Sequence, residues 1–164
     1  MNNVLWITGL PCSGKTTLAK TFIKSHPHFL LLDGDNVRQQ ISSDLDFSIY
    51  SRQENVRRVA SFAKLLLDQN ISSIVSILSP LESHRSLAKD IIGGSFKLIY
   101  LETALDVCEI RDTKGMYKKA RQGEINDFTG IDSPYEKPSS PDLILNTQSE
   151  TINECLGKIK KLIE

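Results

Sequence analysis

Residues 9–16 have the composition and spacing of a phosphate-binding loop. The stretch reads Gly-Leu-Pro-Cys-Ser-Gly-Lys-Thr, with two glycines five apart and followed directly by Lys15 and Thr16. The glycines let the backbone curl until successive N–H groups point at phosphate oxygens, and the following helix adds the positive end of its dipole. Lys15 supplies a point charge, and the hydroxyl of Thr16 suits a Mg²⁺ ion that bridges the terminal phosphates. These residues predict a site for a nucleoside triphosphate with Mg²⁺.

Two carboxylates follow the second apolar run of the chain. Residues 29–32 are Phe-Leu-Leu-Leu, which is typical of a buried strand, and they run directly into Asp33 and Asp35. One aspartate could hold Mg²⁺ through a water molecule, and the other could orient or deprotonate a hydroxyl group. An Asp-Gly-Asp sequence is also a common turn. The phosphate loop at a neighbouring strand end favours the catalytic interpretation.

Basic and amide side chains gather at the start of a predicted helix over 51–69. Arg52 and Asn55 are three residues apart, so they share a helix face and could both approach an anionic substrate. Arg38 and Arg58 have similar chemistry, as do the basic residues between 114 and 121. In most proteins such residues are simply solvated, and the residues alone leave that interpretation open.

Two aromatic residues lie among polar residues in predicted loops. Phe47 and Phe128 have little core to enter at these positions, so they could sandwich a nucleotide base. Loop aromatics often only anchor a loop, and this alternative also stays open.

Alternating strands and helices are predicted to position these groups. Strands are expected at 4–7, 29–32, 71–78, 96–101 and 142–145, and helices at 14–25, 51–69, 80–92, 104–111 and from a capping box at Thr147 and Glu150 to about 162. This alternation predicts a single α/β domain over 1–164, with a five-stranded parallel sheet flanked by helices on both faces. Its ligands should lie beyond the carboxyl ends of the strands, and the polar stretch 112–141 should form a lid.

The composition bears on the partners of the protein. Twenty basic residues balance twenty acidic ones, so no global field favours a nucleic acid or an anionic membrane. The three cysteines lack the spacing of a metal site, and the first ten residues do not resemble a secretion signal. We therefore expect a cytoplasmic protein that binds small anionic ligands and neither nucleic acid nor membrane.

Several stretches resemble the adenylylsulfate kinase family of P-loop kinases, in the order of that family. They are the phosphate loop and residues 32–38, 54–58, 78–80, 114–121 and 128–136. The resemblance covers nearly the whole chain. It implies a P-loop kinase that moves the γ-phosphoryl group of ATP to the ribose 3′-hydroxyl of adenosine 5′-phosphosulfate (APS). The products would be 3′-phosphoadenosine 5′-phosphosulfate and ADP, so the reaction would be sulfate activation.

The resemblance also implies roles for individual residues. ATP would be held by Gly9, Leu10, Pro11, Cys12, Ser13, Gly14, Lys15, Thr16 and Thr17, and Mg²⁺ by Thr16 and, through water, Asp33. The acceptor nucleotide would be surrounded by Asp35, Asn36, Arg38, Phe47, Arg52, Asn55, Leu78, Ser79, Lys114 and Phe128. The catalytic set would be Lys15, Asp33, Asp35 and Ser79. Ser79 matches a serine that is phosphorylatable in family members, although direct in-line transfer needs no phosphoenzyme.

Three departures from the family pattern concern the acceptor. Asp46 precedes Phe47 where the family usually has glycine, Ser51 replaces a common aspartate before Arg52, and Glu82 stands where many relatives are basic. Asp46 and Glu82 put negative charge near an anionic substrate, so they leave the acceptor less certain than the kinase chemistry.

Two alternatives therefore stay open. One is a kinase for the 3′-hydroxyl of another 5′-modified nucleotide, such as a cytidine derivative. The other is a nucleotide-binding regulator without an acceptor, which is disfavoured because no Asn-Lys-x-Asp guanine motif occurs and because the basic lid suits a second anionic substrate. The sequence does not decide between a monomer and a homodimer.

Overall fold

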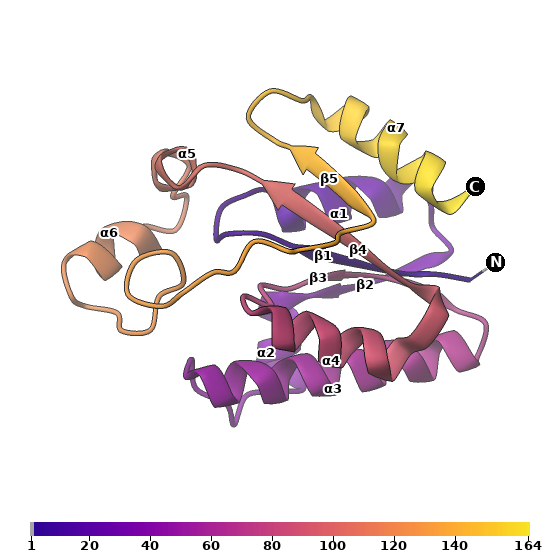
Figure 1. The fold of residues 1–164 in the computed structure, drawn as a ribbon, viewed down its shortest axis with the longest axis horizontal. Coiled ribbons are helices and arrows are strands. Elements are labelled where there is room, and N and C mark those ends of the chain that lie inside the picture. The colour runs from indigo at the N-terminus through magenta and orange to yellow at the C-terminus, as the bar shows by residue number, and fades with distance from the viewer. Residues whose placement is uncertain (1) are drawn as a thin grey trace.

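Five parallel strands form one sheet in the computed structural model, which describes residues 2–164 (Figure 1). The strands are β1 (Val4–Thr8), β2 (Phe29–Asp33), β3 (Ser72–Ser76), β4 (Phe96–Glu102) and β5 (Leu143–Asn146). Their order across the sheet is β2-β3-β1-β4-β5, so β1 lies in the centre. The expected five-stranded parallel sheet is confirmed. Since β1 is the central strand, the segment that follows it starts at the middle of the sheet edge formed by the carboxyl ends of the strands.

Helices cover both faces of this sheet. They are α1 (Lys15–Ser25), α2 (Gly34–Gln40), α3 (Ile49–Asp68), α4 (Glu82–Ile92), α5 (Leu105–Ile110), α6 (Met116–Arg121) and α7 (Ile152–Ile163), with a short 3₁₀ turn η1 (Gly93–Ser95). Because side chains alternate along a strand, Val4 and Trp6 pack in the layer under α3 and α4. Leu5 and Ile7 pack in the opposite layer with α1 and α7, as the two sides of Figure 1 show.

A third, smaller cluster lies beyond the carboxyl ends of the strands. It contains the buried residues Cys108 of α5, Tyr117 and Ala120 of α6, and Phe128. The Tyr117 hydroxyl donates a hydrogen bond to the Pro11 carbonyl over 3.0 Å, which ties α6 to the phosphate loop. The stretch predicted as a lid thus contains a helix and a packed cluster of its own.

Some expected boundaries differ from the structure. The third strand covers Ser72–Ser76 instead of 71–78, and the following helix starts at Glu82 instead of residue 80. Helices α2 and α6 were not expected, because each is too short to show a helical repeat of apolar residues.

The capping box predicted at Thr147 and Glu150 is wrong. The box is formed one turn later by Thr151, which accepts from the Glu154 amide, while the Glu154 side chain accepts from the Thr151 amide over 2.8 Å. Thr147 instead donates to the Ser13 carbonyl over 2.9 Å. The Thr-x-x-Glu spacing occurs twice in a row, and contact with the phosphate loop decides which copy starts α7.

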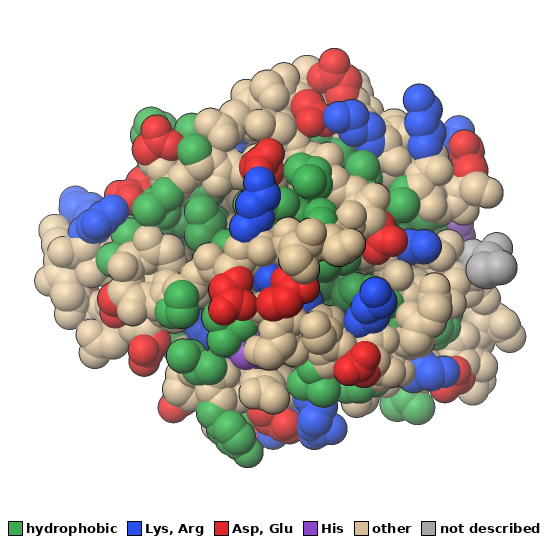
Figure 2. Space-filling model, in the orientation of Figure 1, with side chains coloured by type: hydrophobic (Ala, Val, Ile, Leu, Met, Phe, Trp, Pro, Cys, Tyr) green, Lys and Arg blue, Asp and Glu red, His purple; other side chains and the backbone are tan. Residues whose placement is uncertain are grey.

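Charged side chains of both signs are interspersed on the face shown in Figure 2, in keeping with the balanced composition. The ion pairs of the protein include Lys137 with Glu102 and, at 3.9 Å, Lys97 with Asp142. Among residues 2–164, no helix has both the length and the apolar character that crossing a membrane requires.

Candidate active site

The phosphate loop connects β1 to α1, and its backbone needs glycine at two positions. Gly9 has a φ of 152°, and a Cβ atom there would lie 2.8 Å from Ser13 Oγ and 2.9 Å from the Leu101 carbonyl oxygen. Gly14 has a φ of 100° and precedes the first residue of α1. The loop can therefore curl tightly onto the N-terminus of α1, where backbone N–H groups and the helix dipole favour an anion.

Lys15 is the first residue of α1, and its side chain turns back over the loop. Its Nζ donates to the carbonyl oxygens of Gly9 and Leu10 over 2.8 and 2.6 Å. Burial lowers the pKa of the Lys15 ammonium to about 8. The group is still mostly protonated at neutral pH, and a phosphate placed over the loop would find a poorly solvated positive charge.

Three oxygen-bearing side chains meet beside Lys15, at the carboxyl edge of the sheet. Thr16 Oγ1 donates to Asp33 Oδ2 over 2.7 Å and lies 3.4 Å from Ser76 Oγ. The other carboxylate oxygen of Asp33 accepts the Asp35 amide at the start of α2, over 3.3 Å. Hydroxyl and carboxylate oxygens suit Mg²⁺. No group of three or more His, Cys, Asp or Glu side chains within residues 2–164 could hold a metal ion. Water or phosphate oxygens would therefore have to supply the other ligands of such a cation.

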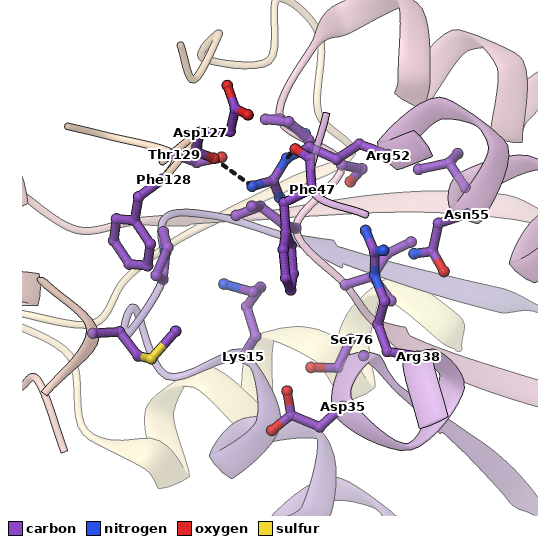
Figure 3. Close-up of a pocket in the computed structure, with 18 of the residues that line it drawn as sticks. Lys15, Asp35, Arg38, Phe47, Arg52, Asn55, Ser76, Asp127, Phe128 and Thr129 are labelled. Atoms are coloured by element: carbon purple, nitrogen blue, oxygen red, sulfur yellow. Dashed lines mark hydrogen bonds between the residues drawn. The ribbon is translucent and has the colours of Figure 1, made fainter. Parts of the chain in front are cut away.

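A cavity of about 260 Å³ adjoins this edge (Figure 3). It brings together many of the predicted site residues, namely Pro11, Lys15, Thr16, Asp35, Arg38, Phe47, Arg52, Asn55, Leu78, Ser79 and Phe128. The other predicted residues do not line it; these are Gly9, Leu10, Cys12, Ser13, Gly14, Thr17, Asp33, Asn36 and Lys114. Most of this second group belong to the phosphate loop, whereas Asn36 is an exposed residue of α2.

Two guanidinium groups of the cavity lie near the ring of Phe47. The guanidinium carbons of Arg38 and Arg52 lie 4.9 and 5.6 Å from the ring centroid. Arg38 donates to the carbonyl of Asp46 over 2.6 Å, and Arg52 donates to the carbonyl of Asp127 over 2.7 Å. Burial lowers the pKa of both groups, yet arginine stays charged at neutral pH.

Neither of these arginines has a carboxylate partner. Within residues 2–164, Arg38 and Arg52 form no ion pair, and the partners of their hydrogen bonds are backbone carbonyl oxygens. Asn55, on the same helix as Arg52, is buried, and its Oδ1 has no hydrogen-bond partner among the described residues. Asp46 acts electrostatically on Arg38, and Asp127 and Asp132 act on Arg52, but none of these carboxylates forms an ion pair with either arginine. A cavity with these two cations and a free amide oxygen is suited to an anionic, hydrogen-bonding ligand.

The two predicted aromatic residues differ in their surroundings. Phe47 is 56% exposed and projects into the cavity, as Figure 3 shows. Phe128 is only 8% exposed, and its ring meets Tyr117 edge-on at 4.9 Å between centroids. Both line the cavity, so a planar base could contact both rings, but Phe128 also anchors its own segment.

Lys114 connects the 112–141 segment to α2. Its ammonium forms an exposed ion pair with Asp35, and this contact raises the pKa of Lys114. Arg52 makes a second connection through its hydrogen bond to Asp127. The 112–141 segment is thus fastened to both sides of the cavity, and Asp35 already faces a cation where the cavity meets the phosphate loop.

Ser79 lines the cavity, but its hydroxyl is directed at the protein core. The residue is 2% exposed, and its Oγ accepts a hydrogen bond from Trp6 Nε1 over 3.1 Å. Its φ of 36° lies in the left-handed region, which is rare for a residue other than glycine. A hydroxyl engaged in this way is poorly placed to receive a phosphoryl group.

The unusual acidic residues near the site are engaged locally. Asp46 Oδ1 accepts from the amide and hydroxyl of Ser48, at 3.0 and 2.6 Å, and these bonds lower the pKa of Asp46 to about 2. Glu82 accepts from Arg85 over 2.7 Å and from Ser139 over 3.2 Å. Neither carboxylate lines the cavity, so neither one opposes an anionic ligand there directly.

Arg58 also lies apart from the cavity. It forms a two-pronged ion pair with Asp44, at 2.6 and 2.8 Å, and donates to the Ile41 carbonyl. These bonds fasten the connection between α2 and α3 that carries Phe47.

Several residues of the cavity were not predicted. Ser76 ends β3, the strand next to β1, but the predicted strand continued to residue 78, so the sequence did not indicate that Ser76 lies at a strand end. Asp127 and Thr129 also line the wall, and Asp127 takes part through its backbone carbonyl, for which side-chain chemistry gives no signal.

Comparison with known proteins agrees with this geometry. The profile of the family described as adenylylsulphate kinase matches residues 1–146. The adenylyl-sulfate kinase of Clostridium acetobutylicum is 46% identical over 160 residues, which are 95% of this chain and 80% of the relative. A probable adenylyl-sulfate kinase of Bacillus subtilis is 39% identical over 99% of this chain and 85% of its own length.

A solved structure is similar over almost the whole length of both chains. The Mycobacterium tuberculosis APS kinase CysC in complex with AMPPNP and APS has a TM-score of 0.93 and 40% sequence identity, covering 99% of this chain and 97% of its own. The chain therefore belongs to the adenylylsulfate kinase family, the P-loop kinases that phosphorylate APS to 3′-phosphoadenosine 5′-phosphosulfate.

Proposed function

We propose that ATP binds on the phosphate loop and APS binds in the cavity, and that the two meet beside Asp35. The observation that carries this assignment is the pair of cavity arginines, Arg38 and Arg52, which have no carboxylate partner among residues 2–164. The phosphosulfate group of APS is an anion that would supply the missing charge. The relative from M. tuberculosis was solved with AMPPNP and APS, which supports two nucleotide sites.

The base of APS would lie against Phe47. This ring is exposed in the cavity and has a second aromatic wall opposite it in Phe128. Stacking tolerates any base, so groups at its edge must select adenine. The unpartnered Oδ1 of Asn55 is one such polar group in the wall. Since Asp46 and Glu82 bond to neighbouring residues, no observation favours a cytidine acceptor.

Phosphoryl transfer would proceed in line between the two nucleotides. The ribose 3′-oxygen of APS forms a bond to the γ-phosphorus of ATP, the bond from that phosphorus to the bridging oxygen breaks, and its electron pair leaves with ADP. Asp35 orients the 3′-hydroxyl and takes its proton, after Lys114 has moved from Asp35 toward the anionic substrates. Lys15 stabilises the charge that develops on the phosphates.

Residues of the sheet edge fit a Mg²⁺ ion as the cofactor of this reaction. Thr16 would hold it directly and Asp33 through water, since their oxygens lie 2.7 Å apart at the mouth of the phosphate loop. A bound Mg²⁺ would neutralise charge on the terminal phosphates of ATP. In this structure the Thr16 hydroxyl donates to Asp33, so the two oxygens already lie side by side.

The segment 112–141 would act as a lid over the bound nucleotides. Its contacts with the rest of the site are the Lys114–Asp35 ion pair and the bond from Arg52 to Asp127. Closure of such a segment excludes water from the reacting phosphate. We also propose a cytoplasmic location for the reaction, supported by three cysteines that are all free thiols.

An acceptor screen tests the assignment. ADP release is measured with ATP and Mg²⁺ alone, with added APS, and with cytidine 5′-diphosphate as a 5′-modified competitor. We expect release to depend on APS and to show the highest kcat/KM for APS. Equal release without any acceptor, or a higher kcat/KM for the cytidine nucleotide, would contradict the assignment of the cavity.

A further inference from the structure

The turn formed by Leu78, Ser79 and Pro80 accepts several hydrogen bonds from buried side chains. All three residues line the cavity. The turn is also the site of a left-handed serine, with a φ of 36°. A non-glycine residue in this conformation persists only where the surroundings impose it, and such strain concentrates at functional sites.

The bonds that impose this conformation come from three buried side chains. Thr8 Oγ1 donates to the Leu78 carbonyl over 2.7 Å, and Trp6 Nε1 donates to Ser79 Oγ over 3.1 Å. Arg85 donates to the carbonyls of Ser79 and Pro80 over 2.9 and 3.1 Å. Thr8, Trp6 and Arg85 are at most 1% exposed, so water does not compete for these bonds.

Two of these side chains, Arg85 and Thr8, also connect the turn to the end of the 112–141 segment. Arg85 donates to the Glu136 carbonyl over 2.8 Å, and the Glu136 amide donates to the Pro80 carbonyl over 2.8 Å. The hydroxyls of Tyr135 and Thr8 lie 3.0 Å apart. The turn is therefore hydrogen-bonded to the central strand β1, to helix α4 and to the 112–141 segment.

We propose that the Leu78–Pro80 turn is a rigid wall of the acceptor site, and that Trp6 is a positioning residue that acts on the acceptor through Ser79. In this arrangement the Ser79 hydroxyl serves as the acceptor of the indole N–H and carries no phosphoryl group during turnover. The inference rests on the proposed binding of APS in the cavity, and it adds a residue of the core of the sheet to the determinants of that binding.

Steady-state kinetics of three variants test the proposal. Trp6→Phe removes the indole donor, and Ser79→Gly removes the hydroxyl while allowing the left-handed backbone. We expect each to raise the KM for APS about three- to tenfold, as for the loss of one hydrogen bond, with kcat and the KM for ATP within about twofold. A combined Trp6→Phe, Ser79→Gly variant should be no worse than either alone, because both remove the same bond.

A matched control separates this effect from general loosening of the core. Phe96 packs against the Trp6 ring, 5.8 Å between centroids, and does not line the cavity. Phe96→Leu should lower the melting temperature and leave the KM for APS unchanged. An equal rise of that KM in Phe96→Leu and Trp6→Phe would overturn the proposal, as would a fall of kcat by more than about fiftyfold in Ser79→Gly.

A spectroscopic readout needs no variant, because Trp6 is the only tryptophan of the chain. A ¹⁵N-labelled sample gives a single indole N–H resonance, and APS added with ADP should shift it, while AMPPNP alone should not. If APS saturates backbone resonances of the cavity and leaves the indole resonance in place, the proposal is wrong. If the acceptor screen selects another nucleotide, the proposed function fails. The role of the Leu78–Pro80 turn and Trp6 is then tested by the same kinetics and the same resonance, with that nucleotide in place of APS.

Discussion

The phosphate loop and the cavity beside it are built in different ways, and both are suited to anions. The loop is one continuous stretch of backbone between β1 and α1, whose glycines have φ values of 152° and 100°. The cavity is assembled from segments far apart in the chain, since Arg38 lies on α2, Arg52 on α3 and Phe128 between α6 and β5. A contiguous site depends on local conformation, whereas an assembled site depends on every packing contact that brings its walls together.

If the two regions bind different substrates, Asp35 is the residue that serves both. Asp35→Asn keeps the shape of the side chain and removes its charge, so we expect kcat to fall by about 10²–10⁴, with ATP binding retained by the loop amides. Coupled measurement of ADP release gives kcat, and calorimetry gives the affinity for AMPPNP. Asp90→Asn, an exposed change on α4, is the control. A loss below about threefold would leave Asp35 as an ordinary turn residue.

Lys15→Ala should affect the loop alone. It removes the charge that we propose faces the terminal phosphates of ATP, and we expect kcat to fall by about 10²–10³ without a change in the circular dichroism spectrum. Lys20→Ala, on the exposed side of the same helix, should behave like the unmodified protein. Turnover of Lys15→Ala close to that of the unmodified chain would argue against ATP on this loop.

Phe47→Ala and Phe128→Ala distinguish stacking from anchoring within the cavity. Phe47 is exposed, so its loss should weaken acceptor binding by roughly 1–3 kcal/mol without lowering stability. Phe128 packs on Tyr117, so its replacement should also lower the free energy of unfolding, by roughly 3–5 kcal/mol. Acceptor titration and urea unfolding measure the two effects. Equal losses of stability in both variants would contradict the assignment of Phe47 to stacking and of Phe128 to anchoring.

The pH dependence of ATP use should follow the loop. A lysine is charged below its pKa, and the pKa of Lys15 is about 8 in the free site. Because kcat/KM reports the free enzyme, we expect kcat/KM for ATP to fall about tenfold between pH 7 and pH 9, and kcat/KM for APS at saturating ATP to fall much less. A flat profile for ATP up to pH 9 would show that the Lys15 charge is dispensable.

The contrast between the regions also explains what could be predicted from the sequence. The loop, the alternation of strands and helices, and the strand end at Asp33 are local patterns, and the structure has them in the expected places. The short helices α2 and α6 carry no periodic signal, and the repeated Thr-x-x-Glu spacing misled the prediction at Thr147 because a contact with Ser13 decides its role. Likewise, nothing local indicates that the hydroxyl of Ser79 would face Trp6.

The acidic residues Asp46 and Glu82 also show what could not be predicted from local sequence patterns. Asp46 and Glu82 raise doubt about an anionic substrate when they are seen only as residues beside a motif. In the folded chain Asp46 accepts from Ser48 and Glu82 pairs with Arg85, and neither carboxylate lines the cavity. The charge of Asp46 still acts on Arg38, which does line it. The effect of a charged side chain on a site depends on the groups that bond to it. Here those groups are Ser48, at the start of α3, and Arg85 of α4, and only the folded chain brings them into place.

We expect the two substrates to bind to two separate groups of residues, one on the phosphate loop and one in the cavity. Calorimetric titration of AMPPNP and of APS, each into Lys15→Ala and Arg38→Ala, tests this most directly. We expect Lys15→Ala to weaken AMPPNP about tenfold or more and APS less than threefold, and Arg38→Ala to show the reverse, because each change removes a charged contact to only one anion. If either variant weakened both ligands to the same extent, the division of the site into a phosphate loop for ATP and a cavity for APS would be contradicted.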